Sequence, residues 1–186
     1  VIAVTLISSD VTERKQGEIA LRESEERFRK VFEEGPLGVG IVGIDGRIQR
    51  ANPRLCEMLG YSEQEIIKLG IQGITHSDDW EKDRQPILRL AQGELDGYCL
   101  EKRYVQKDGE VIWAQLTASL MTDIDGKPTA IIGLVEDITQ RKRTEEVLRR
   151  SEQKMRLHVQ QTPLAVIEWD LEQRVTDWNP GAERIF

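Results

Sequence analysis

The residues best suited to chemistry lie together in one short stretch that reads Thr-His-Ser-Asp-Asp at positions 75–79. A histidine beside carboxylates is the kind of group that binds a metal ion or transfers protons, so His76, Asp78 and Asp79 are candidate ligands of a hydrolytic metal site. Such a site needs a further ligand or base, and the other histidine, His158, lies far along the chain. The same residues also have the spacing of helix caps. We therefore expect a helix start here, with no metal ion and no catalysis.

The two cysteines, Cys56 and Cys99, form neither a Cys-x-x-Cys pair nor a histidine-containing zinc motif. Disulfide frameworks belong to oxidising compartments and to chains with more cysteines, so we expect reduced thiols and a cytoplasmic location. Cys56 stands beside Leu55 and Met58, where a small buried thiol is the simplest interpretation. We expect the same of Cys99.

The charge balance and the hydropathy exclude two classes of partner. The net charge is −7 and the sequence pI is near 5.1, whereas a nucleic-acid-binding surface is basic. The longest apolar run covers residues 1–7, far short of the roughly 20 residues that cross a bilayer. We expect no nucleic acid and no membrane segment in this chain, although its parent protein can be anchored elsewhere.

An internal repeat shows how the chain that carries these residues is organised. Residues 10–15 read Asp-Val-Thr-Glu-Arg-Lys, and residues 137–142 read Asp-Ile-Thr-Gln-Arg-Lys. The match continues without a gap at an offset of 127 residues to the pair Leu59 and Phe186, with 16 of 50 positions identical. Chance pairing at average composition gives about three. The chain is therefore a segment of a tandem array.

The repeat predicts where each unit begins and ends. Only one unit is complete, and the β-branched run at residues 1–7 is expected to be a buried strand of the unit before it. The predicted divisions are the end of a preceding unit (1–12), a linker helix (13–34), the complete unit (35–138), a second linker helix (139–161) and the start of a following unit (162–186).

Within the complete unit, local signals predict two strands, three helices and three strands. Hairpin turns are expected at Asp-Gly pairs, and helix starts at Asn52-Pro53 and at the capping box that begins with Ser62. Pro86 is expected to confine the regular part of the third helix to residues 86–90. The predicted strands cover residues 38–44, 47–50, 98–106, 110–122 and 128–136. Helices that all arise between the second and third strands predict an α+β fold with the helices on one face of the sheet.

Both linkers carry apolar residues seven positions apart at matching places. Leu21 and Phe28 lie in the first linker, and Leu148 and Met155 lie at the same positions in the second. A helix of about 22 residues with so narrow an apolar stripe is marginal in water. We expect these residues to form the seam of a homodimer, in which paired helices pass rotation or register from one unit to the next.

The order of these elements, with Asn52-Pro53, Gly60-Tyr61-Ser62, Lys107-Asp108-Gly109, Trp113 and the stretch from Gly133 to Thr139, resembles the PAS domain with its C-terminal PAC motif. The resemblance implies a five-stranded antiparallel sheet in the order 2-1-5-4-3. It also implies a sensory and dimerising module of a larger signalling protein. We expect a sensor histidine kinase, with a diguanylate cyclase or phosphodiesterase as the alternative.

The resemblance also sets expectations about cofactors. The flavin-binding branch of the family has a reactive cysteine in the loop that here covers residues 69–74, where no cysteine occurs. Haem-binding members use a histidine near the following helix, for which His76 is the candidate and haem the less favoured interpretation. The positions that contact flavin correspond to Ala114, Leu116 and Ala118, none of them polar. Neighbouring inward positions are Leu100, Tyr104, Ile131, Gly133 and Val135.

We therefore expect no cofactor, and a cavity filled either by side chains or by a small apolar ligand. Asp137 and Thr139 end the last strand and begin the second linker helix, which is the covalent exit from the sheet. We expect these two residues to relay the signal.

Overall fold

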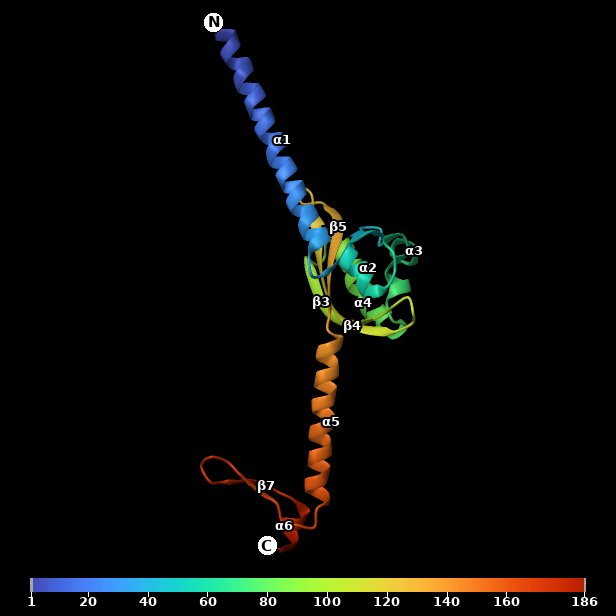
Figure 1. Ribbon diagram of the computed structural model, residues 1–186, viewed down its shortest axis with the longest axis vertical. Helices are drawn as coiled ribbons and strands as arrows, with labels where there is room; N and C mark the ends of the chain where they lie inside the picture. The colour runs from blue at the N-terminus through green and yellow to red at the C-terminus, as the bar shows by residue number, and fades with distance from the viewer. Residues whose placement is uncertain (1, 186) are drawn as a thin grey trace. The chain divides into compact units, whose positions relative to one another are not determined.

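A computed structural model describes residues 2–185, with side chains from Lys15 onward (Figure 1). The chain divides into two units, one ending at Ile138 and the other beginning at Thr139. The first unit contains α1 (Ile2–Glu34), β1 (Gly38–Gly43), β2 (Ile48–Ala51), α2 (Pro53–Leu59), α3 (Glu63–Ile74), α4 (Ser77–Ala91), β3 (Gly97–Val105), β4 (Val111–Thr122) and β5 (Pro128–Asp137). The second contains α5 (Thr139–Gln161), β6 (Ile167–Trp169), β7 (Val175–Trp178) and α6 (Pro180–Ile185).

The first unit is built on a five-stranded antiparallel sheet in the order β2-β1-β5-β4-β3. Helices α2, α3 and α4 all connect β2 to β3 and lie on one face of the sheet (Figure 1). The predicted α+β class and the implied strand order are both confirmed. Alternate residues of β4 are buried under the helices, namely Ile112, Ala114, Leu116 and Ala118.

The turns and helix caps explain where the helices and strands begin and end. In the hairpin between β3 and β4, Gly109 takes a left-handed φ of 88° and the Asp108 carboxylate accepts the Glu110 amide at 2.9 Å. The capping box is present, because the Ser62 side chain accepts the Glu65 amide and the Glu65 carboxylate accepts the Ser62 amide. These local signals are confirmed as predicted.

Two expectations about secondary structure are wrong. Residues 2–7 are the start of α1 and not a strand, while Val1 lies outside the described residues. A strand there would need a hydrogen-bonding neighbour, whereas a helix pairs its own amides and carbonyls. Helix α4 also runs unbroken from Ser77 to Ala91 with Pro86 inside it. Proline has no amide hydrogen, so the carbonyl of Lys82 lacks the helical hydrogen bond that residue 86 would otherwise donate. Lys82 is exposed, so water can hydrate this carbonyl.

Asn52 joins the end of α1 to the sheet and to α2. Its buried side-chain amide donates to the carbonyls of Phe32 at 2.8 Å and Leu37 at 2.9 Å. Its side-chain oxygen accepts the amides of Val39 at 2.8 Å and Leu55 at 2.9 Å. Four hydrogen bonds therefore fix the point where the linker helix meets the domain.

The second unit contains the same joint at the offset of the repeat. The side-chain amide of Asn179 donates to the carbonyls of Val159 at 2.8 Å and Leu164 at 2.9 Å. Its oxygen accepts the amides of Val166 at 2.9 Å and Ala182 at 2.8 Å. Every partner lies 127 residues after its counterpart around Asn52, so the repeated sequence produces a repeated set of contacts.

Candidate ligand cavity and linker joints

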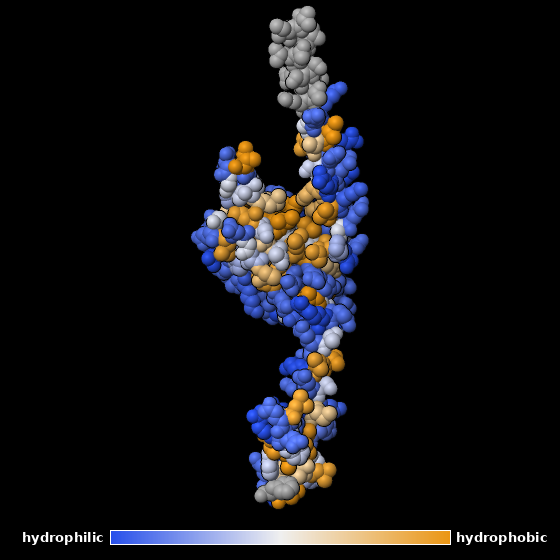
Figure 2. Space-filling model, turned by 90° about the vertical axis from the view of Figure 1, so that its left-hand side faces the viewer, coloured by the Kyte–Doolittle hydropathy of each residue, from blue (hydrophilic) through white to orange (hydrophobic). Residues whose placement is uncertain are grey.

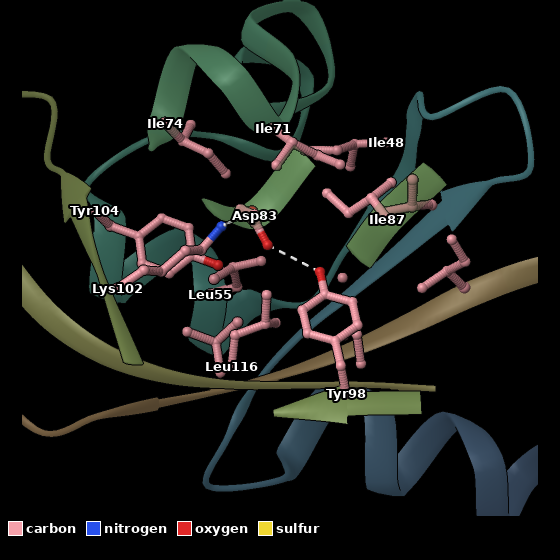
Figure 3. Close-up of a pocket in the computed structure, with 16 residues that line it drawn as sticks. Ile48, Leu55, Ile71, Ile74, Asp83, Ile87, Tyr98, Lys102, Tyr104 and Leu116 are labelled. Carbon is pink, nitrogen blue, oxygen red and sulfur yellow. Dashed lines mark hydrogen bonds and ion pairs between the residues drawn. The ribbon is translucent and has the colours of Figure 1, made fainter. Parts of the chain in front are cut away.

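A cavity of about 60 Å³ lies between the inner face of the sheet and the three helices (Figure 3). Its walls are mostly aliphatic. Of the eight predicted positions, the structure places six around it: Tyr104, Leu116, Ala118, Ile131, Gly133 and Val135. Leu100 and Ala114 are on the same inward-facing rows of β3 and β4 but do not line it.

One wall of the cavity contains an ion pair that sequence reasoning missed. Lys102 of β3 binds Asp83 of α4, and these side chains are 1% and 0% exposed. The Lys102 ammonium also donates to the Thr75 hydroxyl at 3.1 Å and lies 4.4 Å from the centre of the Tyr104 ring. The other Asp83 oxygen accepts the Tyr98 hydroxyl at 2.8 Å (Figure 3). The network links α3, α4 and β3.

The contacts within this network determine the protonation states of its buried groups. Burial acts to lower the pKa of Lys102, but its contacts with Tyr104 and Asp83 outweigh burial and raise that pKa above its ordinary value. Lys102 is therefore a cation and a poor nucleophile. Burial and the Asp83 carboxylate raise the pKa of Tyr98, which stays a neutral donor. The sequence of β3 does contain one indication of this network. Lys102 lies two residues before the inward-facing Tyr104, so both side chains are on the same face of the strand.

The contacts of His76, Asp78 and Asp79 are those of a helix start and an ion pair. His76 is the N-cap of α4, where its Nδ1 accepts the Asp78 amide at 3.3 Å, and it does not line the cavity. Asp79 binds the Arg103 guanidinium through hydrogen bonds of 2.8 and 3.0 Å. Arg103 lowers the pKa of Asp79 to about 2. No group of three metal-binding side chains was found among residues that the structure describes.

Comparison with known proteins identifies the first unit. The family described as PAS fold matches residues 48–135. This range includes β2, α2 to α4, β3, β4, most of β5 and all of the cavity-lining residues except Gly40 and Val42. The first unit contains a PAS domain. A solved PAS domain from Colwellia psychrerythraea superposes with a TM-score of 0.56 at 18% identity, covering 62% of this chain and 97% of that one.

Two longer relatives are signalling proteins that contain a similar segment. The chain is 36% identical over 159 residues to a protein of Escherichia coli (strain K12) named "Probable diguanylate cyclase DgcE". It is 31% identical over 141 residues to "Sensor histidine kinase TmoS" of Ectopseudomonas mendocina. These matches cover 86% and 76% of this chain but only 14% of each relative. The PAS domain is thus homologous to parts of a sensor kinase and of a cyclase.

The cysteines lie away from the cavity of the PAS domain. Cys56 on α2 is partly buried, and desolvation, followed by the nearby Glu63 carboxylate, raises the pKa of its thiol. Cys99 is an exposed residue of β3, so the expectation of a buried thiol at this position is wrong. Both are free thiols, and neither lines the cavity.

The predicted relay residues lie where the PAS domain ends. Asp137 is the last residue of β5 and Thr139 is the first residue of α5. Between them, Ile138 is buried and donates its amide to the Trp113 carbonyl at 2.9 Å. The sheet therefore holds the chain firmly up to the residue before α5.

The predicted seam residues are all exposed. Leu21 and Phe28 lie on α1, and Leu148 and Met155 lie on α5, which has no buried residue. Phe28 stacks on Phe32 with ring centres 5.8 Å apart, and Phe32 is buried at the joint made by Asn52. Each linker helix thus presents apolar side chains to solvent. No described helix is long and apolar enough to span a membrane.

Proposed function

We propose that this chain is a sensory and dimerisation segment of a multi-PAS sensor histidine kinase, without catalytic activity of its own. The observation that carries this proposal is the placement of one PAS domain between two helical linkers with apolar residues at matching positions. The likeness to TmoS supports a histidine kinase as the whole protein. The polar groups of the cavity are engaged with one another, which supports a binding role rather than catalysis.

The proposed division follows the repeat. Residues 13–34 and 139–161 act as linkers around the PAS domain at 35–138, and residues 162–186 begin a following unit. The Asn179 joint and the β6–β7 hairpin support this assignment of the second unit. By sequence, residues 1–12 correspond to the end of a preceding unit, although residues 2–12 are helical in the structure.

We propose a parallel homodimer that forms through the linker helices and the PAS domain. Exposed Leu21, Leu148 and Met155 lose apolar surface if two copies pair, which stabilises a dimer by roughly 1.5 to 3 kcal/mol for each side chain that becomes fully buried. Apolar side chains also gather on the face of the sheet turned away from the helices, beside the end of α1 (Figure 2). Leu134 of β5 is one exposed residue on this outer face.

The likeness to DgcE favours a diguanylate cyclase as the second candidate. The two candidates differ in the reaction of the whole protein. Incubation with labelled ATP should yield a phosphorylated protein if it is a histidine kinase, whereas incubation with GTP should yield a cyclic dinucleotide if it is a cyclase. A cyclic product without protein phosphorylation would contradict the first proposal. The free thiols support a reducing, cytoplasmic setting for either protein.

The relay through α5 is tested by changing its phase. One residue inserted after Arg150 rotates everything downstream by about 100°, while seven residues restore the phase to within about 20°. We expect the single insertion to uncouple the output of the full-length protein from the PAS domain, and the seven-residue insertion to restore the coupling. A protein that responds normally with the single insertion would show that α5 is only a spacer.

A further inference from the structure

The polar wall of the cavity offers few hydrogen-bonding groups to a polar ligand. Both Asp83 oxygens are engaged, one by Tyr98 and the other by Lys102. The Thr75 hydroxyl accepts from Lys102 and donates to the Ile71 carbonyl at 2.8 Å. Among the described residues, no buried side-chain nitrogen or oxygen lacks a partner. A ligand with a charge or an amide would therefore lose its own hydration and gain few partners in exchange.

The size of the cavity limits its occupant further. Its remaining walls include Ile74, Ile87, Leu116, Ile131 and Val135, which offer dispersion contacts only. Engineered apolar cavities of about 150 Å³ stay dry and bind benzene or xenon. The cavity in this PAS domain is about 60 Å³, smaller than that benzene-binding cavity. A molecule that fits this space without rearrangement therefore contains only a few heavy atoms.

We infer that this PAS domain binds a small, uncharged, apolar molecule of a few heavy atoms, and that Gly40 keeps the space for it open. The inference rests on the proposed sensory function and names the ligand class of the same cavity. Desolvation disfavours ions and carboxylates in this cavity, and its size disfavours planar ring cofactors.

Gly40 leaves volume free in the cavity because it has no side chain. It lines the cavity from β1, and its φ is not left-handed, so its backbone also suits residues with a side chain. A Cβ atom at Gly40 would lie 3.6 Å from Leu55 Cδ2, an ordinary contact that needs no rearrangement. In the repeat, Ile167 stands at the position of Gly40 and Ala182 at that of Leu55. The Gly40→Ala variant should therefore fold normally, and its added methyl group should occupy part of the cavity.

Xenon is the direct probe, since it is apolar, uncharged and small. The experiment follows the methyl resonances of Ile131 and Leu116 in the whole chain under increasing xenon pressure, with sodium acetate as the charged probe of similar size. We expect saturable shifts with xenon and none with acetate. Gly40→Ala should weaken xenon binding by about tenfold or more, which is about 1.4 kcal/mol. Ala118→Val, which fills the cavity from β4, is the second variant.

The matched control is Gly17→Ala, because a Cβ at this position on α1 meets nothing within 4 Å. It should bind xenon as the unchanged chain does. Absence of saturable xenon shifts, saturable binding of acetate, or unchanged xenon binding in both folded cavity variants would each overturn the inference. None of these outcomes bears on relay through α5, which the insertions after Arg150 test separately.

Discussion

The buried pair of Lys102 and Asp83 makes a quantitative prediction about stability. Lys102→Met leaves the Asp83 carboxylate buried with Tyr98 as its remaining hydrogen-bond donor, and Asp83→Leu leaves the ammonium with Thr75. Removing one partner of a buried pair costs roughly 3 to 5 kcal/mol, because the other charge is left uncompensated. The free energy of unfolding of a domain is about 5 to 15 kcal/mol, so either single variant should lose a large share of it.

The double variant should behave differently. Replacing both residues by apolar ones of similar volume removes the desolvation cost together with the attraction, and such exchanges are often neutral or stabilising by about 1 to 4 kcal/mol. We therefore expect Lys102→Met with Asp83→Leu to be more stable than either single variant, with a coupling energy of at least about 3 kcal/mol. Urea unfolding followed by circular dichroism at neutral pH measures all four proteins.

The pair formed by Lys107 and Glu65 provides the matched control. It also joins a lysine to a carboxylate, at 2.6 Å between Nζ and Oε1, but both side chains are exposed. Exposed pairs contribute about 0 to 1 kcal/mol, so the same cycle there should give little coupling. If the double variant at Lys102 and Asp83 lost as much stability as the two single losses added together, the energetic account of the cavity wall would be refuted.

Three further predictions concern single positions. Asn52→Ala should cost about 3 kcal/mol, because four hydrogen bonds to backbone groups are lost, and urea unfolding should show it. Arg103 lowers the pKa of Asp79 to about 2, so Asp79 should contribute up to about 2 kcal/mol above pH 4. That contribution should fade as the pH falls toward 2, so unfolding of Asp79→Asn and the unchanged chain should converge there; a constant difference would contradict it. Gly70 has φ 66° and ψ 179°, a conformation open essentially to glycine, so Gly70→Ala should lower stability by about 1 to 3 kcal/mol in thermal melting.

The elements that sequence reasoning located correctly are those whose signals are local. An Asp-Gly turn, an asparagine before a proline and a capping box each act within four residues, so the order of residues contains the whole signal. The inward-facing rows of β4 and β5 follow from alternation in the same way. This is why Leu116, Ala118, Ile131, Gly133 and Val135 can be predicted as neighbours from the sequence alone.

The features that sequence reasoning missed depend on distant or competing interactions. Alternation places Lys102 on the inner face, but its partner Asp83 comes from a helix 19 residues away, and no local pattern links the two. The β-branched run at residues 1–7 suits a strand, yet α1 continues through residues 2–7 because a helix needs no neighbouring strand. Pro86 penalises a helix, yet α4 continues through it and buries Leu90 beyond it.

The asparagine joint has a consequence for protein engineering. All four partners of Asn52, and all four of Asn179, are main-chain amides or carbonyls, so the joint does not depend on the side chains around it. The residues at two of these positions indeed differ between the copies, with Phe32 against Val159 and Leu55 against Ala182. In a chimaera joined just before such an asparagine, the side chain should therefore make the same four main-chain hydrogen bonds, whichever parent supplies the linker helix and whichever unit follows.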